Sequence, residues 1–127
     1  MQSDRESGRA AGQDIRLRPG EDVRARIAAN AVQRGRTFGG QLYLTNKRLI
    51  FMPNPYGQSR GATRFETRLK EIAQLDLAAR GWTIWDGSWR RRLSVTTRTG
   101  AIVYFIAWRP RQVLDLIERV RSGDQAS

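Results

Sequence analysis

The sequence predicts a mainly β fold, in which seven short antiparallel strands form a barrel or sandwich and one C-terminal α-helix caps it. Two observations lead to this prediction. From Glu21 onward, apolar and polar residues alternate over short segments that turn residues separate, as in half-buried strands. Near the C-terminus the apolar spacing changes to three and four residues, the period of an amphipathic helix. Its apolar positions are Val113, Leu116, Ile117 and Val120.

Three strands are expected before the first proline-rich loop. The first begins at Val23 and alternates apolar residues with arginines, and a turn follows at Gln33–Arg36. The next two form a hairpin about Thr45-Asn46-Lys47, since asparagine tolerates the left-handed backbone of a tight turn. Gly39-Gly40 provides for a bulge or a close approach of the neighbouring strand. Leu42 and Leu44 share one face of their strand, Leu49 and Phe51 share one face of the next, and Leu49 is expected in the core, as is Phe105 of the last strand.

Four strands and the helix make up the rest of the domain. The cluster from Pro53 to Gly61 is expected to be a loop, because two prolines and a glycine interrupt a strand ladder. The strands that follow are Thr63–Leu69, one that starts at Ile72, one marked by Leu93, Val95 and Thr97, and Ala101–Ala107 with Val103 and Phe105 on one face. The helix is predicted from Pro110 to Arg121, because proline suits the first helical turn and Ser122-Gly123 ends the apolar stripe.

An aromatic and basic segment lies between the fifth and sixth strands and holds three of the four tryptophans. Asp86-Gly87 is a strong signal for a two-residue hairpin turn. The register of that turn would place Arg80 opposite Leu93, and a bulge at Gly81 would bring Leu75 and Leu77 back into phase. We therefore expect a long, twisted hairpin that protrudes from the barrel. Its candidate contact residues are Trp82, Trp85, Trp89, Arg90, Arg91 and Arg92.

The chemistry of this segment leaves several functions open. Tryptophan beside arginine suits a membrane interface, where rings lie at headgroup depth and guanidinium groups bind phosphates. The same pairing suits a protein interface or stacking on single-stranded nucleic acid. In a purely structural alternative, the tryptophans close the second end of the barrel and the arginines stack on them.

Composition argues against an enzyme. The chain has 127 residues with no cysteine and no histidine, which excludes thiol nucleophiles, zinc clusters of the usual kind and imidazole acid–base chemistry. No close carboxylate pair or glycine-rich phosphate loop is present, so we expect no metal and no cofactor. The net charge of +11 favours anionic partners, although the preference for arginine over lysine is also explained by a GC-rich genome.

The predicted organisation is a disordered arm at residues 1–20, one domain at residues 21–122 and a flexible tail at residues 123–127. The arm is charged and rich in Gly, Ser and Gln, with no apolar core of a signal peptide. The longest apolar run, Ala101–Trp108, is far shorter than the ~20 residues of a transmembrane helix. We expect a soluble, cytoplasmic protein that can associate peripherally with a membrane.

The segment from Gly40 to Phe51, Gly-Gln-Leu-Tyr-Leu-Thr-Asn-Lys-Arg-Leu-Ile-Phe, resembles the characteristic phrase of the GRAM domain, a member of the pleckstrin-homology-like superfold. The step Leu69-Lys70-Glu71-Ile72 and the turn Thr97–Gly100 support the resemblance, which spans about residues 21–121. It implies a non-enzymatic module that binds lipid headgroups or proteins. Thr45 and Arg48 are expected to hold the hairpin together rather than to contact a ligand.

The resemblance also implies a second basic patch at the loop between the first two strands, where Arg34 and Arg36 lie. Gln41 and Tyr43 stand where further basic residues would complete a phosphoinositide site. We therefore expect general attraction to anionic surfaces rather than specific recognition of a phosphoinositide. We predict a binding or adaptor module that contacts a protein partner or anionic lipid headgroups through the tryptophan–arginine hairpin. Nucleic-acid binding and self-association are the alternatives.

Overall fold

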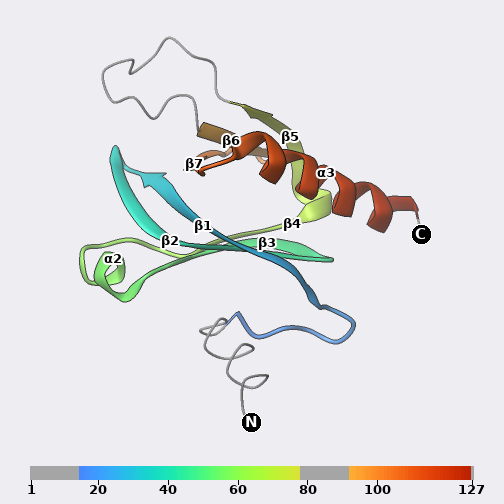
Figure 1. Ribbon diagram of the computed structural model, residues 1–127, viewed down its shortest axis with the longest axis horizontal. Helices are drawn as coiled ribbons and strands as arrows, with labels where there is room; N and C mark the ends of the chain where they lie inside the picture. The colour runs from blue at the N-terminus through green and yellow to red at the C-terminus, as the bar shows by residue number, and fades with distance from the viewer. Residues whose placement is uncertain (1–14, 78–91, 127) are drawn as a thin grey trace.

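The computed structural model describes residues 15–77 and 92–126, the last three by their backbone alone. Seven antiparallel strands form one sheet in the order β4-β3-β2-β1-β7-β6-β5, and a helix follows them (Figure 1). The predicted fold class is confirmed. The strands are β1 (Val23–Gln33), β2 (Arg36–Thr45), β3 (Arg48–Pro53), β4 (Phe65–Arg68), β5 (Ile72–Leu77), β6 (Arg92–Thr97) and β7 (Ile102–Ile106); the helices are α2 (Pro55–Ser59), the 3₁₀ turn η2 (Leu69–Glu71) and α3 (Pro110–Ala126).

The sheet is bent but not closed, because its two end strands, β4 and β5, do not pair with each other. The 3₁₀ turn η2 connects these two strands along the chain. In Figure 1, β2, β3 and β4 lie below, whereas β5, β6, β7 and α3 lie above. Helix α3 packs on β5, β6 and η2. The core lies between these layers and is sealed by the apolar stripe of α3, in which Val113 and Ile117 are buried.

The predicted core positions are confirmed. The side chains of Leu49 and Phe105 are fully buried, and Leu42, Leu44 and Phe51 belong to the same cluster. The Phe105 ring lies 5.8 Å from the ring centroids of both Phe51 and Phe65. Strand alternation explains this, because residues two apart along β3 and β7 point to the same face of the sheet.

Two glycines meet specific backbone requirements. In the two-residue turn between β1 and β2, Arg34 and Gly35 both have left-handed φ angles, 51° and 78°. This is the geometry of a type I′ hairpin, which twists in the same sense as the strands. A β carbon at Gly40 would collide with the main chain of Met52 and Pro53 on β3. The close approach predicted at Gly39-Gly40 is therefore found at Gly40.

Two predicted boundaries differ from the structure. The loop after β3 contains the short helix α2, which Pro55 starts and Asn54 caps by accepting a hydrogen bond from the Gly57 amide at 2.7 Å. Helix α3 continues through Ser122-Gly123 to Ala126, into the predicted tail. Gly123 does not adopt the left-handed conformation that ends many helices, so it only weakens the last turn.

The register of β5 and β6 pairs their apolar residues. Leu77 lies opposite Leu93, and Leu75 lies opposite Val95. An uninterrupted ladder from a turn at Asp86-Gly87 would have placed Arg80 opposite Leu93, with Leu75 and Leu77 out of phase. The leucines are in phase, as the predicted bulge at Gly81 would make them, but the turn and the bulge lie outside the described residues. The apolar faces of the two strands decide the register, because a shift by one residue would turn Leu75 away from the core.

A buried ion pair fastens the β2–β3 hairpin to the chain before β1. The side chains of Arg48 and Glu21 are 2% and 0% exposed, and Nε and Nη2 of Arg48 donate to the two carboxylate oxygens at 2.7 and 2.8 Å. Nη1 of Arg48 donates to Glu66 at 2.8 Å. The Thr45 hydroxyl donates to Glu21 at 2.6 Å and accepts from the Arg48 amide at 2.8 Å. Thr45 and Arg48 thus hold the hairpin, as predicted.

The ion pair shifts the ionisation of both partners. Burial opposes the charged form of Glu21, but hydrogen bonds from Arg48, Thr45 and the Arg18 amide outweigh it and hold the pKa of Glu21 at about 2. The pKa of Arg48 is raised, chiefly by its hydrogen bond to Glu21. Burial also opposes the charged form of Glu66, yet Arg48 and Arg64 lower the pKa of this carboxyl.

We expect the protein to lose stability in acid. Because Glu21 titrates lower in the folded chain than its ordinary value of 4.5, its contribution is complete above that pH and is lost as the pH falls towards about 2. The loss is on the order of 3 kcal/mol. Urea unfolding between about pH 6 and about pH 2 measures most of it. The Glu21→Gln variant should show a flatter pH dependence, and an equally steep one would contradict this assignment.

The chain contacts the sheet earlier than the predicted boundary at Glu21. Ile15 is 3% exposed and packs with Tyr43 and Ile50 on the outer face of β2 and β3. Nη2 of Arg48 approaches the carbonyl oxygens of Ile15 and Arg16, both at 3.3 Å. The predicted disordered arm therefore does not include residues 15–20, because two large apolar side chains on the outer face need cover.

Removal of residues 1–14 is expected to leave the melting temperature unchanged, because a polar, charged segment buries little apolar area. Removal of residues 1–20 should cost about 2 to 4 kcal/mol, since it exposes Tyr43 and Ile50 and takes away two acceptors of Arg48. Thermal unfolding of the two truncations and of Ile15→Ala tests the boundary. Equal melting temperatures for both truncations would show that the contact of Ile15 contributes nothing.

Candidate binding surfaces

Most of the predicted contact residues lie outside the part of the chain that the structure describes: Trp82, Trp85, Trp89, Arg90 and Arg91. Arg92 is described and is 6% exposed. It begins β6 opposite Ile106 and makes its contacts within the fold. An exposed run of three arginines is therefore not formed, because the third already belongs to the sheet.

The second predicted patch, Arg34 and Arg36, lies at an exposed end of the molecule together with α2. We call Arg34, Arg36 and Arg60 the basic tip. Arg34 donates to the carbonyl of Gly61 at 2.9 Å, which joins the β1–β2 turn to the segment after α2. The Gln33 side chain reinforces this junction with two hydrogen bonds to the main chain of Thr63, at 2.8 and 3.0 Å. The basic tip is thus assembled from two loops that are fixed to each other.

Aromatic rings accompany the arginines of the basic tip. The guanidinium group of Arg60 lies 5.5 Å from the ring centroid of Tyr56, which is 70% exposed. The guanidinium group of Arg36 lies 5.4 Å from the ring centroid of the buried Phe38. Both distances are within the range of cation–π attraction, and Nη1 of Arg60 also donates to the Tyr56 hydroxyl at 3.4 Å.

The charge around the basic tip has one sign. From Val23 to Phe65 the sequence holds eight basic residues and no acidic one. Among the described residues, none of the three arginines of the basic tip forms an ion pair with a carboxylate. The described ion pairs of the chain instead involve Arg18, Arg24, Arg48, Arg64 and Arg121. As far as the described residues show, the charge of the basic tip is therefore positive and is not neutralised by ion pairs.

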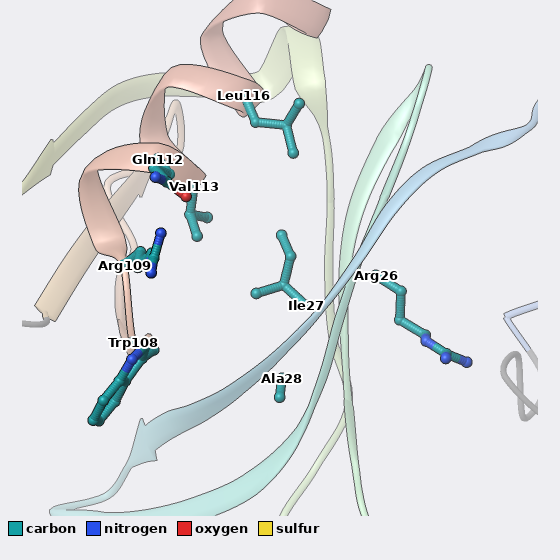
Figure 2. A pocket seen from close by; sticks show the side chains of 8 residues that line it. All are labelled: Arg26, Ile27, Ala28, Trp108, Arg109, Gln112, Val113 and Leu116. Carbon is teal, nitrogen blue, oxygen red and sulfur yellow. The ribbon is translucent and has the colours of Figure 1, made fainter.

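A second surface is an apolar groove of about 420 Å³ between β1 and the start of α3, which we call the β1–α3 groove (Figure 2). Ile27 points from β1 towards Val113 and Leu116 of α3, whereas Arg26 points away to the other side of the strand. The residues that line it are Arg26, Ile27, Ala28, Trp108, Arg109, Gln112, Val113 and Leu116. Trp108, at the junction of β7 and α3, is 72% exposed.

Neither surface can be recognised in full from the sequence. Arg60 and Tyr56 were placed in a loop, and only the fold brings that loop beside the β1–β2 turn. In the sequence, Trp108 is only the last residue of an apolar run. A signal was present, because Trp108 lies two residues before the helix-starting Pro110, where the chain leaves the last strand and a large side chain is often only partly covered.

Within the described ranges, no group of three or more acidic side chains is arranged to hold a metal ion. No described helix combines the length and apolar character needed to cross a membrane.

Comparisons with known proteins identify the fold but no family. No family model matches the sequence, and no curated protein is similar to it. Among solved structures, a C-terminal domain of an unknown protein from Leishmania infantum superposes with a TM-score of 0.69 at 14% identity, over 93% of this chain and 97% of that one. The Vps36 N-terminal PH domain superposes with a TM-score of 0.58 at 16% identity, over 88% and 87%.

The DH/PH domains of PDZ-RhoGEF, solved in complex with activated RhoA, superpose with a TM-score of 0.66 at 10% identity, over 91% of this chain and 33% of that one. At such low identities the likeness concerns the fold alone. The chain has a pleckstrin-homology-like fold, a mainly β architecture with one C-terminal helix.

Proposed function

We propose that this protein is a non-enzymatic, GRAM-like module that docks peripherally on an anionic membrane surface through its basic tip. The observation that supports this most directly is the absence of acidic residues between Asp22 and Glu66, a segment that includes all of the basic tip. Basic residues near an acidic bilayer contribute roughly 1 kcal/mol each. Tyr56 adds an exposed amphipathic ring, the kind that lies at headgroup depth.

The vesicle experiment is designed around charge. Phosphatidylcholine vesicles with about 30% phosphatidylserine should bind the protein at low salt, whereas pure phosphatidylcholine vesicles should not, and added salt should weaken binding. Replacing Arg34, Arg36 and Arg60 by glutamine should lower the affinity on the order of 100-fold, by about 1 kcal/mol for each charge. Co-sedimentation at several lipid concentrations measures both effects.

A matched control separates a local site from net charge. Replacing Lys70, Arg111 and Arg119 by glutamine removes the same number of charges from exposed positions outside the basic tip. This control should lose much less affinity than the basic-tip variant. Equal losses would refute a specific role of the basic tip. Equal binding to acidic and neutral vesicles at low salt would refute the membrane function altogether, and tighter binding to a single-stranded oligonucleotide would favour nucleic acid instead.

The tryptophan–arginine segment extends the same proposal. We expect Trp82, Trp85 and Trp89 to insert at the membrane interface beside Arg90 and Arg91, so that acidic vesicles shift tryptophan emission to the blue. Trp85→Ala should reduce the shift and leave the electrostatic attraction in place. An unchanged shift in this variant would remove Trp85 from the contact surface.

A further inference from the structure

Strand β1 is paired along the whole of one edge but only part of the other. It pairs with β2 from Val23 to Gln33, whereas it pairs with β7 only at Asn30–Val32. The chain leaves the sheet after β7 and turns into α3. Within the described ranges, no strand pairs with the second edge of β1 before Asn30, and this edge borders the β1–α3 groove.

The register indicates which main-chain groups face the open edge. In a two-residue hairpin the residues that flank the turn, Gln33 and Arg36, form the first hydrogen-bonded pair, and such pairs recur at every second residue. Along β1 the odd-numbered residues therefore direct their N–H and C=O groups to β2. Arg26 and Ala28 direct theirs to the opposite edge, where an added strand would find a regular row of donors and acceptors.

Side chains beside this edge offer an apolar pocket. Ile27 is only partly buried by the core, and Val113 and Leu116 of α3 lie across from it (Figure 2). Trp108 stands at one end of the groove with 72% of its surface exposed. Large exposed aromatic side chains next to a pocket are typical of protein–protein contact surfaces.

The positive charge at the β1–α3 groove indicates the charge of the segment that would bind there. Arg109 lines the groove at the N-terminus of α3, and no acidic residue is among the lining residues. The first turn of α3 also has no acidic side chain, so the positive end of the helix dipole is not compensated there. The whole chain has a net charge of +11. An acidic segment would complement this surface, and a basic one would be repelled.

We infer that the β1–α3 groove binds an extended, acidic peptide segment of a partner protein. The segment pairs as an additional strand with the open edge of β1, in line with β7, and places an apolar side chain between Ile27 and Trp108. An acidic side chain lies near Arg109 and the start of α3. The edge from Ala25 to Ala29 accommodates about five residues, or ~17 Å of extended chain. This inference is independent of membrane docking at the basic tip, because the two surfaces share no residue.

The test begins with a phage library that displays random peptides of about 12 residues, selected on the full-length protein. Enriched peptides should alternate apolar and acidic residues, and their synthetic, fluorescently labelled forms should bind with an affinity measurable by polarisation. Trp108→Ala and Ala28→Pro should each weaken binding at least about tenfold. Proline at Ala28 removes the N–H that faces the open edge while keeping the ladder with β2.

Tyr56→Ala is the matched control, because Tyr56 is an aromatic residue beside the basic tip whose side chain is as exposed as that of Trp108. It should leave peptide binding unchanged, and Trp108→Ala should leave binding to acidic vesicles unchanged. The peptide should also slow hydrogen exchange at the amides of Arg26 and Ala28 more than at Ile27, a change that a merely structural defect would not produce.

Several results would overturn the inference. The inference fails if the selection enriches no peptide or if the enriched peptides are basic. It also fails if the peptides bind the Trp108→Ala variant as tightly as the unaltered protein. Loss of vesicle binding in Trp108→Ala, with peptide binding intact, would assign the groove to a membrane. Failure of the vesicle experiment with retained peptide binding would refute the proposed function alone.

Discussion

Replacing Arg48 with methionine is expected to lower the free energy of unfolding by about 3 to 5 kcal/mol. The side chain of Arg48 is 2% exposed, and its removal leaves the carboxylate of Glu21 buried with Thr45 as a side-chain donor. Such a group must then either stay charged without its ion-pair partner or take up a proton. Urea unfolding near neutral pH, followed by circular dichroism, measures the loss.

Two controls make this result specific. Arg24→Met breaks the ion pair with Asp22, in which both side chains are about half exposed or more, and should cost less than about 1 kcal/mol. The double variant Glu21→Gln, Arg48→Met should lose less than the sum of the single variants, since no charge remains buried. A loss below about 1 kcal/mol in Arg48→Met would contradict the structural role of this ion pair.

Replacing Phe105 with alanine should cost about 3 to 5 kcal/mol, because the ring is fully buried and its contacts with Phe51 and Phe65 cannot be replaced without a cavity. Leu49→Ala should cost about 2 to 5 kcal/mol for the same reason. Thermal or urea unfolding of each variant provides the measurement.

Ile102→Ala is the control for the core variants, because Ile102 belongs to the same strand as Phe105 but is 53% exposed. Its loss should stay below about 1 kcal/mol. Equal losses for Ile102→Ala and Phe105→Ala would show that β7 is seated with the wrong face towards the core.

The two proposed surfaces differ in how far the sequence could lead to them. Arg34 and Arg36 could be identified because the family resemblance implies a basic loop between the first two strands, and both arginines lie in that loop. Arg60 and Tyr56 join them only because α2 folds back onto the β1–β2 turn, through the bond from Arg34 to Gly61. The groove depends on where β7 stops pairing with β1, which no local pattern reports.

The sequence by itself determined the type and order of the seven strands and of α3, but not α2, because alternation and helical spacing over a long segment are local properties of neighbouring residues. It also determined the core faces of β2, β3 and β7, and the structural role of Thr45 and Arg48 in the hairpin. Tertiary structure alone decided the register of β5 on β6, the docking of Ile15 and the pairing of Arg48 with Glu21. These features join residues far apart in the chain, and burial of apolar area and of charge, rather than local preference, selects among the possible contacts.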